Sequence, residues 1–148
     1  MSIRLARLED SETILKWVNQ SDSLRWKYRN NGKIKKNDHE KWLRKTLLNN
    51  NSRIWIIEDE KKNNIGQIRI DLIKKLANID IFVQTEFRSK GYALRSLKEA
   101  MKNFSDDFNS VKFLAIVNKK NFASANLFIK CGFKLKSISK DQWQYFNL

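Results

Sequence analysis

Residue types that build many functional sites are scarce in this chain of 148 residues. Cys131 is its only cysteine and His39 its only histidine. This excludes an internal disulfide and a zinc site built from several cysteine and histidine ligands, and we expect Cys131 to be a buried, unreactive thiol. Proline is absent, and each glycine therefore needs a structural reason. The four glycines are Gly32, Gly66, Gly91 and Gly132.

Long apolar runs are missing as well. No segment approaches the roughly 18 apolar residues of a membrane span, and the first residues show no signal-peptide core. We therefore expect a cytoplasmic protein without a membrane partner. With 41% hydrophobic residues the chain has enough apolar material for a core, and its length predicts one domain over residues 1–148.

Acidic residues are outnumbered. Sixteen Asp and Glu stand against thirty Lys and Arg, which gives a net charge of +14 at pH 7. Because a field of this sign attracts anions, we expect an anionic ligand. A basic nucleic-acid-binding module is the non-enzyme alternative. The lysines are spread through turns and helix faces without a helix-turn-helix or zinc-finger pattern, so we expect no nucleic-acid partner.

The spacing of apolar residues predicts a mixed α/β domain with the element order βααβββαβαββ. The continuous apolar run 111–117 predicts a strand that is buried on both faces. Short polar turns join the three consecutive strands after the second helix, which predicts an antiparallel meander. The expected strands are 2–7, 52–58, 65–72, 76–83, 111–117, 133–138 and 142–146, and the expected helices are 11–18, 36–48, 88–104 and 121–131.

The segment with the clearest chemistry joins the strand ending at Val83 to the helix expected from Arg88. Backbone N–H groups at a helix N-terminus bind phosphate oxygens, and the positive end of the helix dipole adds to the attraction. Gly91 and Ala93 allow the backbone to approach such a ligand closely, while Arg88 and Lys90 add charge for a pyrophosphate. The Rossmann and Walker glycine patterns are both absent.

Two motifs in this chain resemble those of the GNAT acyltransferase superfamily. The pattern Arg88-x-x-Gly91-x-Ala93 is similar to the superfamily's pyrophosphate-binding signature. The segment Asn121–Phe133 resembles the superfamily's Asn-x-x-Ser/Ala-x-x-Leu-Tyr-x-x-x-Gly-Phe segment. The order of the expected strands and helices agrees with the superfamily over nearly the whole chain.

The resemblance implies an acetyl-CoA-dependent N-acetyltransferase without a metal, which passes an acetyl group directly to a primary amine. The strands ending at Val83 and Val117 would diverge and leave a cleft, in which the pantetheine arm pairs like an added strand. The amide of Val83 would stabilise the developing oxyanion. The implied cofactor-binding residues are Ile81, Phe82, Val83, Arg88, Ser89, Lys90, Gly91, Tyr92, Ala93, Leu94, Asn121 and Ser124.

The resemblance leaves the proton-transfer residues open. Many members have a tyrosine general acid where this chain has Phe128, which cannot donate a proton. Asp80, on the same strand face as Asn78, is a candidate base or else a solvated or ion-paired strand residue. His39 is a second candidate, or else an exposed or capping residue of its helix. Tyr145 in the terminal hairpin is a candidate donor to the thiolate, or else a packed aromatic.

The N-terminal half lines the acceptor side in this superfamily. Here it resembles the bacterial branch that acetylates UDP-linked 4-amino-4,6-dideoxy sugars in the pseudaminic and legionaminic acid pathways. On this hypothesis Arg25 meets the diphosphate, Trp26 or Tyr28 stacks on uracil or on a sugar face, and Asn78 contacts the acceptor. Alternative acceptors are the N-terminal amine of a ribosomal protein or peptide, and other small amines. We expect a monomer or a homodimer.

Overall fold

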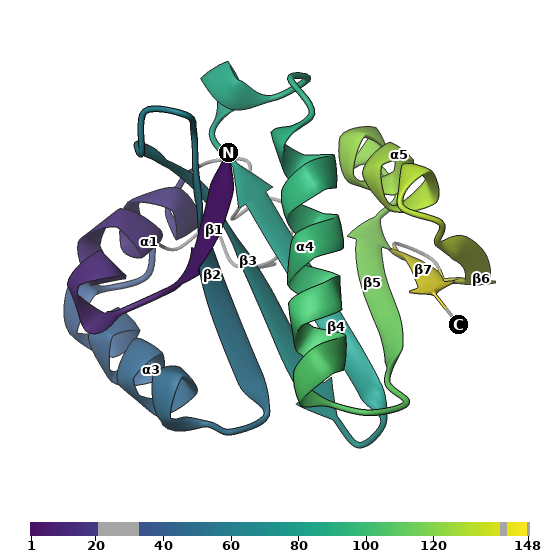
Figure 1. Ribbon diagram of the computed structural model, residues 1–148, viewed down its shortest axis with the longest axis horizontal. Coiled ribbons are helices and arrows are strands. Elements are labelled where there is room, and N and C mark those ends of the chain that lie inside the picture. Colours follow the sequence, from purple (N-terminus) through teal and green to yellow (C-terminus); the bar gives the residue numbers. More distant parts are fainter. Residues whose placement is uncertain (21–32, 140–141, 148) are drawn as a thin grey trace.

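The computed structural model describes residues 1–20, 33–139 and 142–147. They form one mixed sheet in the order β1-β2-β3-β4-β5-β7-β6, with helices on both faces (Figure 1). The predicted α/β class and element order are confirmed. No helix in the described ranges is long and apolar enough to cross a membrane. The strands are β1 (Ser2–Leu5), β2 (Ser52–Glu58), β3 (Asn64–Ile73), β4 (Leu76–Val83), β5 (Lys112–Asn118), β6 (Lys134–Ile138) and β7 (Gln142–Asn147). The helices are α1 (Ser11–Val18), α3 (Lys36–Leu48), α4 (Tyr92–Asp107) and α5 (Phe122–Lys130), with the short 3-10 helices η1 (Leu8–Asp10) and η2 (Thr85–Phe87).

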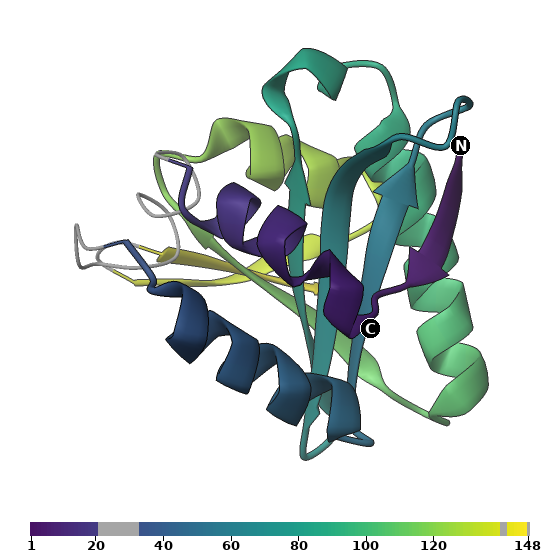
Figure 2. The same ribbon diagram turned by 90° about the vertical axis from the view of Figure 1, so that its left-hand side faces the viewer.

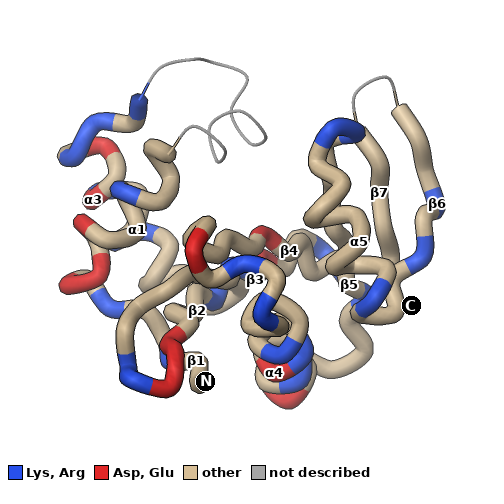
Figure 3. Tube along the Cα trace, turned by 90° about the horizontal axis from the view of Figure 1, so that it is seen from above, with Lys and Arg blue, Asp and Glu red and all other residues tan. Residues whose placement is uncertain are grey.

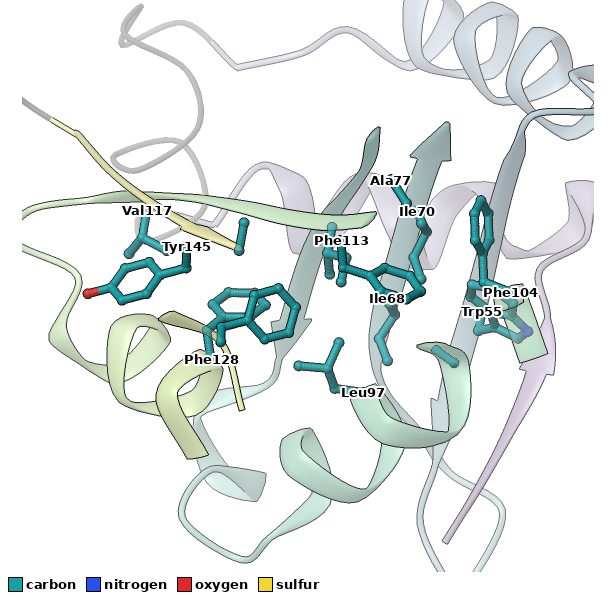
Figure 4. Packing of buried hydrophobic residues seen from close by; sticks show 14 of the residues in the cluster. Trp55, Ile68, Ile70, Ala77, Leu97, Phe104, Phe113, Val117, Phe128 and Tyr145 are labelled. Carbon is teal, nitrogen blue, oxygen red and sulfur yellow. The ribbon is translucent and has the colours of Figure 1, made fainter. Parts of the chain in front are cut away.

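One face of the sheet packs against α4, whose apolar residues recur every three or four positions. Leu97 and Phe104 of α4 are fully buried in one cluster with Ile68 and Ile70 of β3 (Figure 4). Burying a side chain of this size contributes about 1.5–3 kcal/mol to folding. This core fixes α4 against the middle of the sheet and thereby fixes the position of its first turn.

The other face of the sheet is covered by α1 and α3 (Figure 2). Trp17 of α1 and Leu43 of α3 are fully buried in a second cluster with Ile56 of β2. The amide of Asn19, at the C-cap of α1, donates to the carbonyl oxygen of Ile34 at 3.0 Å and accepts from its N–H at 2.8 Å. This pair of bonds ties the chain that enters α3 to the end of α1.

The strands β4 and β5 are parallel and pair over a short distance. Leu76–Asn78 pairs with Lys112–Leu114, and the two strands then continue without further pairing to Val83 and Asn118. On their outer sides β4 stays paired with β3, and β5 stays paired with β7. The two strands therefore separate toward their carboxyl ends, as the resemblance implies.

Two expectations from the sequence are wrong in detail. The helix expected from Arg88 begins at Tyr92, because Ser89 and Gly91 have left-handed φ values of 61° and 83° that a right-handed helix cannot include. The strand β5 is not buried on both faces along its length, since Ile116 is 49% exposed. The reason is that the helices cover only one face of β5, which every second residue of the strand forms, and Ile116 belongs to the opposite face.

Candidate active site

A cleft opens where β4 and β5 separate. Its volume is about 570 Å³, and it is lined by the carboxyl halves of both strands, the loop before α4, the first turn of α4 and one side of α5. This volume lies within the range of sites that hold small molecules and cofactors. Because β4 has no strand partner on this side after Asn78, its last residues border the cleft directly.

The backbone of β4 presents an open edge to the cleft. The N–H of Gln84, which directly follows β4, donates to the carbonyl oxygen of Ile65 at 2.9 Å. Residues opposite each other in an antiparallel pair alternate between hydrogen-bonded and non-hydrogen-bonded positions, so the backbone groups of Ile81 and Val83 point away from β3. The N–H and carbonyl of Ile81 and the N–H of Val83 are able to pair with an extended ligand as a neighbouring strand would, while the carbonyl of Val83 accepts a hydrogen bond from Arg88.

Gly66 keeps the end of β4 close to β3. A Cβ atom at this position would overlap the carbonyl oxygen of Phe82 in the neighbouring strand. Any other residue would displace the last residues of β4, and with them the backbone edge at Val83. Close packing of two strands therefore explains why this position is glycine.

The loop before α4 places backbone N–H groups beside the cleft. Gly91 is the N-cap residue of α4, and no side chain caps the helix or adds an acidic group to its first turn. Among the described residues, the first N–H groups of α4 therefore have no side-chain acceptor. Together with the positive end of the helix dipole, they form a site that suits an anion such as a pyrophosphate.

Most of the residues predicted to bind the cofactor line the cleft. They are Ile81, Phe82, Val83, Arg88, Ser89, Gly91, Ala93, Leu94, Asn121 and Ser124. Lys90 and Tyr92 do not line it. The ammonium of Lys90 lies over the ring of Phe87 at 5.5 Å, and the hydroxyl of Tyr92 donates to Oε2 of Glu60 at 2.6 Å. Phe87 itself lines the cleft and also has a ring contact with Tyr92, so both side chains lie beside the cleft without lining it.

One face of α5 lines the cleft along its length. The residues on this face are Ala123, Asn126, Leu127 and Lys130. Leu127 is the leucine of the second motif, whereas the motifs did not identify Asn126 and Lys130, although their spacing after Ala123 is that of one helix face. Asn121 has a local role, because its Oδ1 accepts the N–H of Ser124 at 3.2 Å and thereby caps α5.

Of the three candidates for proton transfer, the structure brings Asp80 to the cleft. Asp80 alternates onto the same face of β4 as Asn78 and Phe82, and the ring of Phe82 lies 6.0 Å from that of Trp17 in α1. The Oδ1 atom of Asn78 is buried and has no hydrogen-bond partner among the described residues. This polar face lies on the α1 and α3 side of the sheet, opposite the side covered by α4.

His39 and Tyr145 lie outside the cleft. The expectation that His39 is exposed or capping is wrong, since it is 2% exposed, with Nδ1 3.3 Å from Oγ of Ser11. Burial lowers the pKa of His39, and its Nε2 has no partner within the described ranges. Tyr145 is buried in the α4-side cluster with Val117 and Phe128 (Figure 4), and burial raises its pKa. Neither side chain contacts the cleft.

Comparisons with known proteins agree with this geometry. A family model described as an acetyltransferase (GNAT) domain matches residues 1–134. The chain belongs to this family. No curated protein sequence matches this acetyltransferase.

Several solved structures are similar to the GNAT domain described here. A domain from Methanocaldococcus jannaschii DSM 2661 has a TM-score of 0.86 at 20% identity and covers 99% of this chain and 96% of its own. Spermidine N-acetyltransferase from Vibrio cholerae, in complex with CoA and spermine, has a TM-score of 0.87 at 21% identity and covers 99% and 94%. A dodecameric structure of that enzyme in an intermediate state has a TM-score of 0.80 at 21% identity and covers 99% and 92%. At these identities the similarity shows the fold alone.

This acetyltransferase has further polar residues on the α1 and α3 side of its sheet. Arg69 lies opposite Asp80 in the β3–β4 register. Its guanidinium lies 5.2 Å from the ring of Trp42, and its Nε is 3.0 Å from Oδ2 of Asp71. The sequence motifs did not identify this group. The acceptor residues predicted from the resemblance, namely Arg25, Trp26 and Tyr28, lie outside the described residues.

Proposed function

We propose that this acetyltransferase binds acetyl-CoA in the cleft between β4 and β5 and transfers the acetyl group to a primary amine of a small molecule. One observation carries the proposal: a single cleft joins an uncapped helix N-terminus to an open strand edge. The first suits a pyrophosphate, and the second suits the amide groups of a pantetheine arm. CoA has these two chemical groups next to each other.

The backbone of β4 and the side chain of Asp80 have separate roles in the proposed step. The lone pair of a neutral amine attacks the thioester carbonyl carbon and forms the C–N bond. The C–S bond then breaks, and its electron pair leaves with the thiolate of CoA. The N–H of Val83 donates to the carbonyl oxygen as negative charge develops there. Asp80 accepts the proton that the amine loses, directly or through water, and water protonates the thiolate.

For the acceptor we propose an amine on an anionic small molecule, with a UDP-linked amino sugar as the first candidate. The net charge of +14 supports an anion, because a positive field concentrates anions and repels polycations. In the described part of the chain, Lys and Arg are spread over α3, α4, α5 and β6 instead of one continuous surface (Figure 3). That distribution favours a small anion over a nucleic acid.

A polyamine is the second candidate, and two observations favour it. The spermidine N-acetyltransferase from Vibrio cholerae was crystallised with spermine. On the α1 and α3 side, Asp71 lies 3.0 Å from Arg69, and Asp80 stands opposite Arg69 in the β3–β4 register, so this part of the sheet has two carboxylates and one guanidinium. A local excess of negative charge there would attract an ammonium group.

Release of the free CoA thiol, measured with acetyl-CoA and one acceptor at a time, tests both candidates. The acceptors are a UDP-linked 4-amino-4,6-dideoxy sugar, spermidine and an N-terminal peptide of a ribosomal protein. We expect turnover of the UDP-linked sugar. Turnover of spermidine alone would replace the first candidate with the second, and turnover of the peptide alone would contradict both. Absence of acetyl-CoA binding would overturn the proposed function itself.

The role of Asp80 is tested with Asp80→Asn and the matched variant Asp38→Asn, which changes an exposed residue in the first turn of α3. We expect Asp80→Asn to lower kcat by about 10²–10⁴-fold, because general base catalysis contributes a factor of this size. The KM for acetyl-CoA should stay the same, and the acidic limb of the pH–rate profile should disappear. Equal kcat values for the two variants would show that Asp80 is not the base.

A further inference from the structure

Two lysines lie where the cleft-lining stripe of α5 ends. Lys130 is the last residue of α5 and the last member of the stripe that begins at Ala123. Lys98 lies on α4, four residues or about 6 Å along the helix axis from Leu94, which also lines the cleft. Both lysines are exposed, so an ammonium at either position is accessible to a ligand that extends out of the cleft.

Contacts between α4 and α5 bring the two lysines toward each other. The sulfur of Met101, three residues after Lys98, lies 3.9 Å from the sulfur of Cys131, which directly follows Lys130. The charge of Lys98 also reaches the thiol of Cys131, where it opposes the rise in pKa caused by burial. Lys98, through its charge, and Lys130, as the preceding residue, are therefore both neighbours of Cys131 at the α4–α5 contact.

Neither lysine is neutralised. No described residue forms an ion pair with Lys98 or Lys130, whereas Lys102, one turn further along α4, is paired with Asp106 at 3.0 Å. Two positive charges without a counter-ion on neighbouring helices attract an anion to the surface between them. The pair thus forms a cationic site one helical turn from the site for the pyrophosphate.

The chemistry of this pair identifies its ligand. CoA has a phosphomonoester on the 3′ oxygen of its ribose and the pyrophosphate on the 5′ oxygen of the same ribose. One sugar ring therefore holds the 3′-phosphate close to the pyrophosphate. Such a group carries a charge of about −1.5 to −2 at pH 7. We propose that Lys98 and Lys130 bind the 3′-phosphate of CoA and thereby distinguish CoA from 3′-dephospho-CoA. This rests on the proposed function, because it requires CoA in the cleft.

Dissociation constants for CoA and 3′-dephospho-CoA, measured by calorimetry at one fixed salt concentration, test the proposal. The proteins are the wild type, the double variant Lys98→Met/Lys130→Met, and Lys102→Met as the matched control. Because a hydrogen bond to a charged group changes affinity by about tenfold or more, we expect the wild type to bind CoA at least about tenfold more tightly than 3′-dephospho-CoA. In the double variant this ratio should fall to about one, with unchanged affinity for 3′-dephospho-CoA.

The outcomes separate this site from the proposed function. If the wild type binds both ligands equally, or if the double variant keeps its preference for CoA, the phosphate site is overturned while CoA binding stands. An equal loss of affinity for both ligands in the double variant would also overturn it, since a general effect of charge or folding explains such a loss. The phosphate site would also be overturned if the control Lys102→Met lowered the preference for CoA as much as the double variant does. Failure of the wild type to bind either ligand overturns both proposals.

Discussion

The Nε atom of Arg88 donates a hydrogen bond to the carbonyl oxygen of Val83 at 2.8 Å, and the guanidinium lies 5.7 Å from the centre of the Phe82 ring. The first residue of the phosphate-binding motif is thereby attached to the last residue of β4. From its sequence position, Arg88 is expected to supply charge to a pyrophosphate. The bond to Val83 gives it a second role, which is to hold the end of β4 beside the cleft.

Substitutions of Arg88 separate these two roles. Arg88→Lys keeps the positive charge but lacks the planar guanidinium that reaches Val83, and Arg88→Met removes both. If the bond positions the end of β4, we expect kcat to fall about tenfold or more in both variants, while the Kd for acetyl-CoA rises mainly in Arg88→Met. Steady-state kinetics and calorimetry measure the two quantities. Full activity of Arg88→Lys would show that charge alone matters.

A carboxylate at Gly91 should abolish cofactor binding. Gly91→Glu would place a negative charge at the helix N-terminus, where the pyrophosphate is expected. Gly91→Ala is the control, because a Cβ atom here meets nothing closer than Nε of Arg95 at 3.8 Å and adds only the cost of a left-handed φ, about 1–2 kcal/mol. Calorimetric titration with CoA should therefore detect binding to the Ala variant and none to the Glu variant. Near-normal affinity of Gly91→Glu would mean that the phosphate site is elsewhere.

The stability of the protein should depend on His39 at mildly acidic pH. Burial lowers the pKa of His39 below its ordinary value of 6.5, so the unfolded chain binds this proton more readily than the native protein. The contribution of His39 to the free energy of unfolding is fully present above about pH 6.5 and is lost as the pH falls through its folded pKa. Over that range the free energy of unfolding changes by at most about 1.4 kcal/mol per pH unit. Urea unfolding between pH 5 and 8 measures the slope. His39→Gln should reduce the slope, and an unchanged slope in this variant would assign it to other groups.

Tyr145 should be dispensable for the chemical step. Its ring is 2% exposed and belongs to the core on the α4 side, and it does not line the cleft. Because Tyr145→Phe keeps the packed ring and removes only the hydroxyl, we expect kcat to stay within about twofold of the wild type, far from the loss that removal of a general acid causes. A loss of a hundredfold with normal CoA affinity would place its hydroxyl in proton transfer.

Much of the fold follows from local patterns in the sequence. The apolar residues Ile54, Ile56 and Ile57, the short polar turn 61–64 and the clean alternation in 65–72 were sufficient to predict an antiparallel meander. Leu97, Ala100 and Phe104 recur at helical spacing in the sequence, and all three are fully buried on the face of α4 that enters the core. These features depend on residues that are close together in the chain.

The remaining features depend on tertiary contacts or on single dihedral angles. The start of α4 at Tyr92 results from the left-handed φ of Ser89, a residue type that does not demand it. His39 lies among polar neighbours in sequence and is buried only because α3 packs on α1. The bond from Arg88 to Val83 depends on a turn of the chain through η2 that residue types alone do not specify.

Amide hydrogen exchange of β4, measured with and without CoA, is the most direct test of the central claim that the open edge of this strand binds the cofactor. If the pantetheine arm pairs with that edge, CoA should slow exchange of the Ile81 and Val83 N–H groups, which point away from β3. The N–H of Gln84, already bonded to Ile65 at 2.9 Å, should change less and serves as the internal reference. Saturating CoA that leaves exchange at Ile81 and Val83 unchanged would contradict the account.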